Sequence, residues 1–369
     1  MNPDTDSGTN GKAAPALAVK VFDFFSGCGG ASRGFQEAGM DIAFGLDWDT
    51  DAEQSFKRNF PSATFVAGDI RQVDADSIRK SVDQQRPHPV LFCGCAPCQP
   101  FTKQNTTRPE PEADERVPLL LEFLRLIRRC EPDIVFVENV PGIQNVSPDS
   151  EPLSGFLRGL QEAGYSEPTH DSVSLKRYGV PQGRRRFLLL ASRHGRLGLP
   201  DETHGPGTDN PDFATVRDWI GDLPELAAGE TDPTVPDHRA ARLSQLNLRR
   251  IRATPEGGGN RDWAEDLQLT CHKGATGYSD VYGRMSWDRP ASGLTTRCIS
   301  YSNGRFGHPE QDRAISVREA ACLQTFPMDF RFSGSPTSKA RQIGNAVPVR
   351  LATVIGDHVG RHLAEAGLV

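Results

Sequence analysis

The chain has 369 residues, a formal net charge of −6 and 37% hydrophobic residues. This length suits one large domain and a second, smaller one. The net charge does not exclude nucleic acid as a partner, because a local basic face can lie on an acidic protein. Eight irregularly spaced cysteines argue against a disulfide framework and suit a reducing compartment.

We expect neither a targeting segment nor a membrane span. Residues 1–18 are polar and small, so we expect a disordered tail there rather than a signal peptide. No run of 18 or more apolar residues occurs, so no transmembrane helix is expected. These features predict a cytoplasmic protein.

Short apolar runs mark the predicted strands, at residues 21–25, 42–46, 64–68, 90–94, 134–138 and 187–191. Segments with helical spacing lie between several of them, at 31–39 and 117–130. Apolar strands that alternate with helices indicate a doubly wound, mostly parallel α/β sheet covered on both faces. Ligands of such sheets bind at the carboxyl ends of the strands, so the residues after each run are the candidates for a site.

This alternation ends near residue 195, so residues 19–195 form the expected sheet domain. Residues 196–338 contain much Gly, Pro, Asp, Thr and Arg, with weak periodicity over most of this range, and we expect a smaller, loop-rich domain there. The amphipathic stretch 348–367 predicts a terminal helix. The segment 339–369 is therefore expected to return to the sheet domain.

A glycine-rich stretch, DFFSGCGG at 23–30, includes the end of the first predicted strand. Gly27, Gly29 and Gly30 predict a tight strand-to-helix turn where a ligand can approach the backbone. The dinucleotide motif G-x-G-x-x-G needs another glycine at the position of Ser32. A nicotinamide-dependent oxidoreductase is therefore disfavoured.

Acidic residues follow the second and third predicted strands. Asp47 can accept hydrogen bonds from both hydroxyls of a ribose, and the neighbouring Trp48 can lie flat on a purine. Asp69 can accept a hydrogen bond from an adenine amino group. Together these residues predict an adenosine pocket without a pyrophosphate cradle, which suits S-adenosylmethionine. The alternative is that each acid only caps the helix after it.

Cys98 is the candidate nucleophile. It lies past the fourth predicted strand, between Pro97 and Pro100, and these rigid flanks hold the thiol in place. Cys93 and Cys95 fit the ordinary role of cysteine as a small buried hydrophobe. No second cysteine pair follows at ligand spacing, so we expect no zinc or other metal site.

Glu138 ends the fifth predicted strand. Its place after the run IVFV predicts partial desolvation, which raises a carboxyl pKa and suits a proton donor near neutral pH. The alternative is a glutamate paired with a neighbouring arginine. Arg184 and Arg186 share one face of an extended segment, so a parallel pair could orient an anionic or carbonyl group. Their charge is also the best source of the positive field that a Cys98 thiolate needs.

Taken in order, these motifs resemble those of the C5-cytosine DNA methyltransferase family. No single tripeptide is specific, but the order and spacing of the set are. The chain departs from the usual pattern at Asp47, where glutamate is usual. The resemblance runs from residue 21 to about 350 and includes D-x-F-x-G-x-G-G at 23–30, PCQ at 97–99, ENV at 138–140, Q-x-R-x-R at 182–186, RP at 289–290 and QIGNAVP at 342–348.

The resemblance implies a sequence-specific DNA (cytosine-5-)-methyltransferase that uses S-adenosylmethionine and flips the target cytosine out of the duplex. It implies that Cys98 adds to carbon 6 of the cytosine and that Glu138 contacts ring nitrogen 3 and the exocyclic amine. Arg184 and Arg186 would position the base and the catalytic loop. The implied cofactor-binding residues are Phe25, Ser26, Gly27, Gly29, Gly30, Asp47, Trp48, Asp69, Ile70, Asn345 and Val347.

The resemblance also places a target-recognition domain and hinge at 196–338. The expected partners are double-stranded DNA and a restriction endonuclease that acts on the same sequence, and we expect a monomer. Alternatives are methylation of tRNA, against which the arginine-bearing middle region argues, and a catalytically silent DNA-binding protein, against which the intact motifs argue. The DNA-binding candidates are Gln99, Arg249, Arg250, Arg252 and Arg289.

Overall fold

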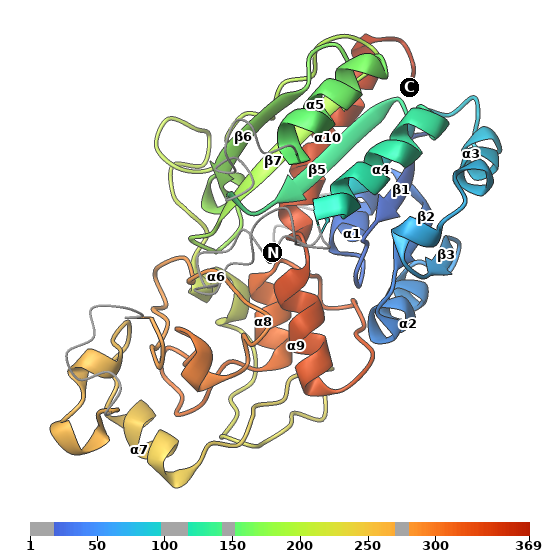
Figure 1. Cartoon of the computed structure of the whole chain (residues 1–369). Helices are drawn as coiled ribbons and strands as arrows, with labels where there is room; N and C mark the ends of the chain where they lie inside the picture. Colours follow the sequence, from blue (N-terminus) through green and yellow to red (C-terminus); the bar gives the residue numbers. More distant parts are fainter. Residues whose placement is uncertain (1–17, 97–116, 142–151, 270–279) are drawn as a thin grey trace, which may run out of the picture.

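The computed structural model describes residues 18–96, 117–141, 152–269 and 280–369 (Figure 1). Two expected site residues, Cys98 and Gln99, lie outside these ranges, as does most of the expected N-terminal tail. The described strands form a sheet in the order β3-β2-β1-β4-β5-β7-β6. Their bounds are β1 (Lys20–Phe24), β2 (Asp41–Asp47), β3 (Thr64–Ala67), β4 (Val90–Gly94), β5 (Ile134–Asn139), β6 (Thr169–Ser174) and β7 (Arg185–Ser192).

Strand direction confirms the prediction of a mostly parallel sheet. Strands β1 to β5 run parallel, whereas β7 runs antiparallel to both β5 and β6. Each predicted apolar run corresponds to a strand. The sequence did not reveal β6, because this strand lies at the sheet edge and its residues are all exposed or half-buried, so it has no apolar run.

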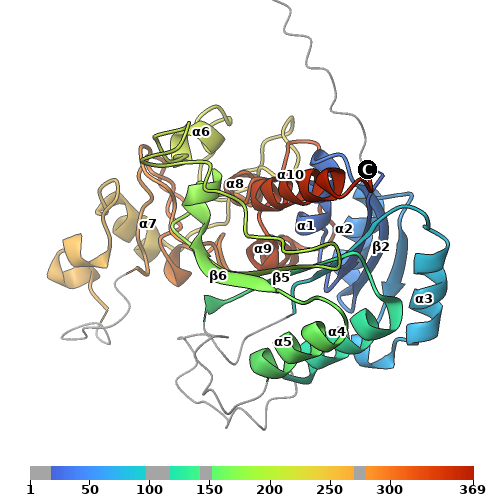
Figure 2. The same ribbon diagram turned by 90° about the horizontal axis from the view of Figure 1, so that it is seen from above.

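Helices cover both faces of the sheet (Figure 2). On the face of α3, α4 and α5, Phe24 of β1 packs against Phe92 of β4 and Phe123 of α4, with ring centroids 4.8 and 5.4 Å away. Within the described ranges, no helix is long and apolar enough to span a membrane. The bounds are α1 (Gly30–Glu37), α2 (Thr50–Asn59) and α10 (Val349–Glu365) on one face, and α3 (Ala75–Asp83), α4 (Val117–Cys130) and α5 (Pro152–Glu162) on the other.

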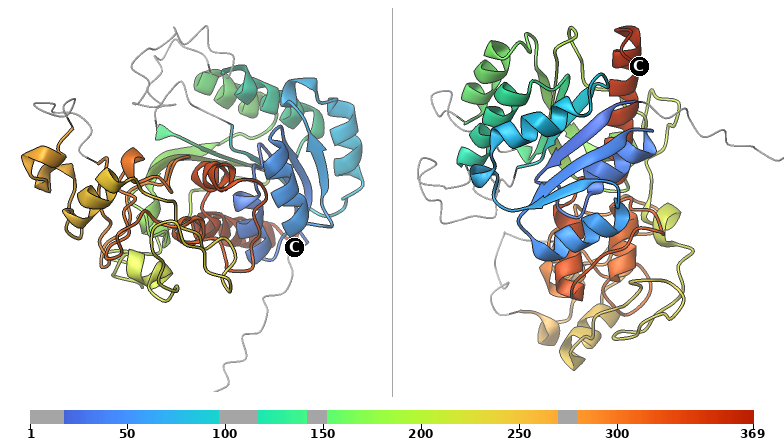
Figure 3. Two further views of the ribbon diagram at one scale, coloured as in Figure 1. Left: turned by 90° about the horizontal axis from the view of Figure 1, so that it is seen from below. Right: turned by 90° about the vertical axis from the view of Figure 1, so that its right-hand side faces the viewer.

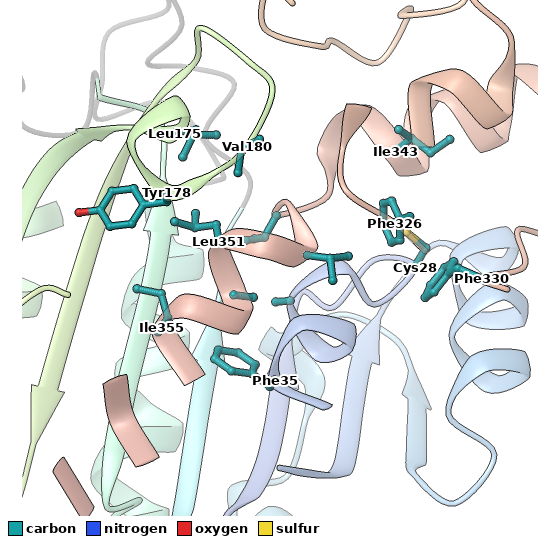
Figure 4. Close-up of a cluster of buried hydrophobic side chains, with 14 of the residues drawn as sticks. Cys28, Phe35, Leu175, Tyr178, Val180, Phe326, Phe330, Ile343, Leu351 and Ile355 are labelled. Carbon is teal, nitrogen blue, oxygen red and sulfur yellow. The ribbon is translucent and has the colours of Figure 1, made fainter. Parts of the chain in front are cut away.

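The C-terminal helix α10 returns to the sheet domain and packs along α1. A Cβ at Gly34 of α1 would lie only 2.3 Å from the carbonyl oxygen of Val349, so glycine is what permits this close contact. Figure 4 shows Phe35 of α1 facing Leu351 and Ile355 of α10 in the same core. Residues more than 300 positions apart therefore share one apolar layer.

Two helices, α8 (Val317–Leu323) and α9 (Pro336–Asn345), lie between the sheet and the small domain (Figure 3). Ser335 caps α9 by accepting a hydrogen bond from the Ser338 nitrogen at 3.2 Å, and Pro336 occupies the first turn. The expected domain boundary at 338/339 falls inside α9, and the division into domains stays a prediction.

The small domain contains α6 (Val216–Ile220) and α7 (Gln245–Arg252), short 3₁₀ turns and loops. A buried arginine, Arg284, holds several of these loops together. Its guanidinium donates to the carbonyl oxygens of Thr254 at 2.7 Å, Ile251 at 2.9 Å and His308 at 2.9 Å. The domain also has its own apolar core, formed by Ile251, Trp263, Leu267, Tyr301 and Ala314.

Candidate active site

The glycine-rich stretch forms a tight turn between β1 and α1. Three of its residues have positive φ angles: Phe25 at 61°, Gly27 at 53° and Gly29 at 96°. The Ser26 nitrogen donates to the carbonyl oxygen of Leu46 at 3.0 Å, which ties the turn to β2. The predicted turn therefore exists, and it lies at the carboxyl ends of β1 and β2.

Asp47 and Trp48 lie beside this turn. The carboxylate of Asp47 accepts hydrogen bonds from the backbone nitrogens of Gly27 at 2.8 Å and Asp49 at 2.9 Å. Burial raises its pKa, and the two N–H donors oppose that shift. Trp48 is 78% exposed, which is unusual for so large an apolar side chain. Asp49, rather than Asp47, caps α2, so the capping alternative does not explain Asp47.

Asp69 is different. Its carboxylate accepts from the Arg71 backbone nitrogen at 2.9 Å and so caps the 3₁₀ turn that begins at Ile70. The Arg71 side chain binds the same carboxylate, with Nε at 2.9 Å from Oδ2, and lowers its pKa. The capping alternative therefore holds for Asp69. A contact from Asp69 to adenine stays a prediction that would require competition with Arg71, and Ile70 is buried.

The C-terminal segment meets the glycine turn. A Cβ at Gly30 would lie 2.5 Å from the carbonyl oxygen of Val347, so the two backbones touch where Gly30 has no side chain. The Cys28 thiol lies 3.8 Å from the carbonyl oxygen of Gln342. Asn345 is exposed at the end of α9. The structure therefore brings Val347 to the turn, and a contact of Asn345 or Val347 with the cofactor stays a prediction.

Glu138 lies buried at the end of β5 and forms an ion pair with Arg186. Arg186 Nε lies 2.6 Å from Glu138 Oε1, and both side chains are about nine-tenths buried. Burial raises the pKa of Glu138, while the charge of Arg186 and its hydrogen bond act in the opposite direction. Both readings of the sequence, desolvation and pairing with arginine, therefore hold for this residue.

Asn139 connects Glu138 with the chain that leads to Cys98. Its side-chain nitrogen donates to the carbonyl oxygen of Ala96 at 3.3 Å. The register of the parallel pair, Cys93 opposite Phe136, already places the ends of β4 and β5 side by side. Cys93 is fully buried, and burial raises the pKa of its thiol well above the usual value. The site residue after them, Cys98, lies outside the described residues.

The expected parallel pair of arginines is not formed. Arg186 binds Glu138, whereas Arg184 Nη1 donates to the carbonyl oxygens of Leu294 at 2.8 Å and Gly344 at 3.2 Å. The expectation failed because backbone carbonyls, which the sequence does not display, take the guanidinium of Arg184. Of the two arginines, only Arg186 therefore contacts Glu138.

Asp23 is a buried carboxyl that the sequence analysis treated only as part of the glycine motif. Its side chain is 1% exposed and accepts a hydrogen bond from the Ser32 hydroxyl at 2.6 Å. Burial raises its pKa to about 7. The signal that could have found it is its position inside an otherwise apolar strand run.

The DNA-binding candidates of the small domain divide into two kinds. Arg249 and Arg252 are 61% and 65% exposed and pair with acids of the same domain, and Arg289 is also exposed. Arg250 is corrected: it is buried, donates to the carbonyl oxygen of Leu267 at 3.0 Å, and lies over Trp263 at 5.1 Å. An arginine on the core side of α7 supports the fold, and its burial argues against a contact with DNA.

The fold and the site define a class. The seven-stranded sheet with an antiparallel β7 is a fold that this chain shares with methyltransferases of known structure. A solved prophage-encoded DNA modification methyltransferase of E. coli is similar over 94% of this chain and 99% of its own, with a TM-score of 0.70 at 23% identity. The Dnmt2 methyltransferase of S. pombe is similar over 94% and 98%, with a TM-score of 0.61 at 17% identity.

Sequence comparison identifies the family. The family model for C-5 cytosine-specific DNA methylases matches residues 19–361, and the chain belongs to this family of DNA (cytosine-5-)-methyltransferases. It is 40% identical to the type II methylase M.HgiDII of Herpetosiphon aurantiacus, over 93% of this chain and 95% of that protein. It is 30% identical to the type II methyltransferase M.Eco47II of Escherichia coli, over 92% and 78%.

Proposed function

We propose that this chain transfers a methyl group from S-adenosylmethionine to carbon 5 of a flipped-out cytosine in duplex DNA, with Cys98 as the nucleophile. The observation that carries the proposal is the buried Glu138, held by Arg186 one strand away from the segment that leads to Cys98. Cys98 is the second residue after Ala96 in the sequence, and two residues span at most about 7 Å. Because the Asn139 side chain donates to the carbonyl oxygen of Ala96, the chain that leads to Cys98 leaves β4 beside the end of β5.

The residues beside the glycine turn suit the adenosine part of the cofactor. Trp48 offers an exposed ring for the adenine, and the half-buried Asp47 offers acceptors for the ribose hydroxyls. The glycine turn and Val347, whose carbonyl oxygen lies against Gly30, would contact the rest of the cofactor. The cofactor, when bound, supplies a methyl group on a positively charged sulfur, which carbon 5 can attack once it is electron-rich.

Cytosine carbon 5 is a weak nucleophile, and the protein's part is to change that. The Cys98 thiolate would form a bond to carbon 6, and the displaced ring electrons would be stabilised at nitrogen 3 by a proton from Glu138. Burial holds the pKa of Glu138 above its usual value, which suits proton donation near neutral pH. After methylation, loss of the proton on carbon 5 would let the bond to sulfur break and restore the aromatic ring and the thiolate.

We infer duplex DNA, rather than RNA, as the acceptor. Exposed Arg249, Arg252 and Arg289 on the small domain offer contacts to phosphates. The similar proteins M.HgiDII and M.Eco47II are named as type II methylases. On this basis we propose a monomeric modification enzyme with a restriction endonuclease as its functional partner.

Labelled S-adenosylmethionine offered with duplex DNA or with tRNA tests the acceptor. We expect label in DNA, and sequencing of bisulfite-treated DNA should map it to one short sequence. Glu138→Gln should slow methyl transfer by roughly 100-fold or more while DNA binding changes little. Label in tRNA alone, or equal losses of binding and turnover in Glu138→Gln, would contradict the proposal.

A further inference from the structure

A chain of buried amide side chains runs through the junction between the sheet and the small domain. Gln182 is fully buried, and its oxygen accepts from the Leu294 nitrogen at 3.1 Å. Its nitrogen donates to the Gln324 side-chain oxygen at 2.6 Å and to the carbonyl oxygen of Leu323 at 2.8 Å. Gln324, also fully buried, donates to the carbonyl oxygen of Ala346. These bonds form an unbroken path from Leu294 to Ala346.

One end of this path reaches the glycine turn, and the other end lies against α9. At one end, the next residue is Val347, whose carbonyl oxygen contacts Gly30 of the glycine turn. At the other end, Thr295 packs so closely on α9 that a Cβ at Gly344 would lie 2.2 Å from the Thr295 carbonyl oxygen. The path therefore connects the glycine turn with the segment of Leu294 and Thr295, where the chain returns from the small domain.

Arg184 makes a second connection between the same two segments, through the carbonyl oxygens of Leu294 and Gly344. Figure 4 shows the apolar neighbours of this junction: Phe326 and Ile343 lie above Cys28 of the glycine turn. Apolar contacts tolerate small shifts, whereas hydrogen bonds between buried groups fix a distance and a direction.

We propose that Gln182 and Gln324 are positioning residues for methyl transfer. They fix the segment around Leu294, where the chain returns from the small domain, relative to the glycine turn. The proposal rests on the function proposed above, since it concerns the placement of a base against a methyl donor. Reacting groups must be held within about 3 to 3.5 Å, so a displacement of one segment lowers the rate without removing either ligand. Neither glutamine touches the reacting atoms.

Methionine variants test this role, because methionine has a similar length but forms no comparable hydrogen bonds. Gln324→Met should weaken binding of S-adenosylhomocysteine roughly tenfold, or about 1.4 kcal/mol, in calorimetric titration far below the melting temperature. Gln311→Met is the matched control. Its side chain, like that of Gln324, makes two hydrogen bonds, but both are accepted by its oxygen, from the Leu226 nitrogen at 3.0 Å and Arg313 at 2.8 Å, away from the path. We expect its affinity to equal that of the wild type.

A double-mutant cycle then tests whether the two glutamines act as one path. Single-turnover methylation with saturating ligands should slow roughly tenfold in Gln182→Met and in Gln324→Met, and by about the same factor in the double variant. If the double variant is slowed by the product of the two single factors, the glutamines act independently, and this result would contradict a shared path. Lowered melting temperature with unchanged affinity and rate would reduce both residues to a structural role.

The two proposals fail in different ways. A wild-type chain that neither binds S-adenosylhomocysteine nor methylates DNA would overturn the proposed function itself. A functional wild type with variants that match it would overturn only the positioning role. If Gln324→Met does not fold, Gln182→Met leaves the Ala346 bond intact and carries the rate test alone, and an undiminished rate there would contradict the proposal.

Discussion

The sheet domain and the small domain are stabilised by different chemistry. In the sheet, Phe22, Phe24 and Phe92 pack with ring centroids 4.8 to 5.5 Å apart, and helices cover both faces. In the small domain, Arg284 and Arg313 are 4% and 0% exposed and their guanidinium groups bind backbone carbonyls and acids. Apolar side chains in a sequence predict burial. An arginine does not show from sequence alone whether its guanidinium binds backbone carbonyls or DNA.

Two buried carboxyls make the contrast sharper. Asp23 in the sheet and Glu319 in α8 are each 1% exposed. Burial raises the pKa of Asp23 to about 7. Burial acts in the same direction on Glu319, but two hydrogen bonds of 2.7 Å from Arg313 outweigh it and lower the pKa. A buried cation thus decides whether a buried acid keeps its charge.

The largest expected effect is the loss of Arg284. Arg284→Met should lower the free energy of unfolding by about 3 to 5 kcal/mol, because several buried carbonyls lose their donor at once. Chemical denaturation measures the change. Arg252→Met, at a residue that is 65% exposed, is the control and should change stability by less than about 1 kcal/mol. Equal losses in the two variants would remove the distinction between structural and surface arginines.

Asp23→Asn should show how much a charged carboxylate at this buried position destabilises the fold, because the effect of the substitution on stability should depend on pH. Because the folded-state pKa is raised, the acid's contribution is most favourable below pH 4 and is lost as the pH rises to about 7. The stability of Asp23→Asn relative to wild type should therefore improve between pH 4 and 7, by up to about 4 kcal/mol, and stay level above. Denaturation curves at pH 5 and 8 measure it. A difference that does not depend on pH would contradict the shift.

Trp48 differs from the aromatic residues of the core, because its ring is exposed and available to a ligand. Trp48→Ala should weaken S-adenosylhomocysteine binding by about 1 to 3 kcal/mol, the usual strength of a base stacked on an aromatic ring, in calorimetric titration. Because Trp48 is 78% exposed, unfolding should change by less than about 0.5 kcal/mol. Trp48→Phe should keep most of the affinity. A variant that loses stability but binds normally would assign Trp48 to the fold.

The smallest expected effect separates two neighbours on α7. Arg249→Ala should weaken DNA binding modestly and reduce the slope of affinity against salt concentration by about 0.9, while stability changes little. Arg250→Ala should lower stability by about 2 kcal/mol, because the buried carbonyl of Leu267 loses its donor. Filter binding at several salt concentrations distinguishes them, and a smaller salt slope in a fully folded Arg250→Ala would reverse our correction.

The sequence predicted those features of the fold that depend on a periodic pattern or on the position of a particular residue type. Apolar runs predicted the buried strands, and the glycines after β1 predicted the turn that the structure shows. Partners far apart in the chain left no such pattern. Arg184 donates to the carbonyl oxygens of residues 294 and 344, Gln182 accepts from the nitrogen of residue 294, and the edge strand β6 has no apolar run. Asp69 was ambiguous because a cap and a ligand contact use the same residue type.

The central claim is a transient bond between Cys98 and carbon 6 of the target cytosine. A duplex with 5-fluorocytosine at the target position tests it directly, because fluorine cannot leave carbon 5 as the proton does and the adduct persists. With S-adenosylmethionine present, we expect a DNA complex that survives denaturation, with the added mass at Cys98 in peptide mass spectrometry. Methylation of ordinary DNA without any such adduct, or an adduct at another residue, would contradict the account.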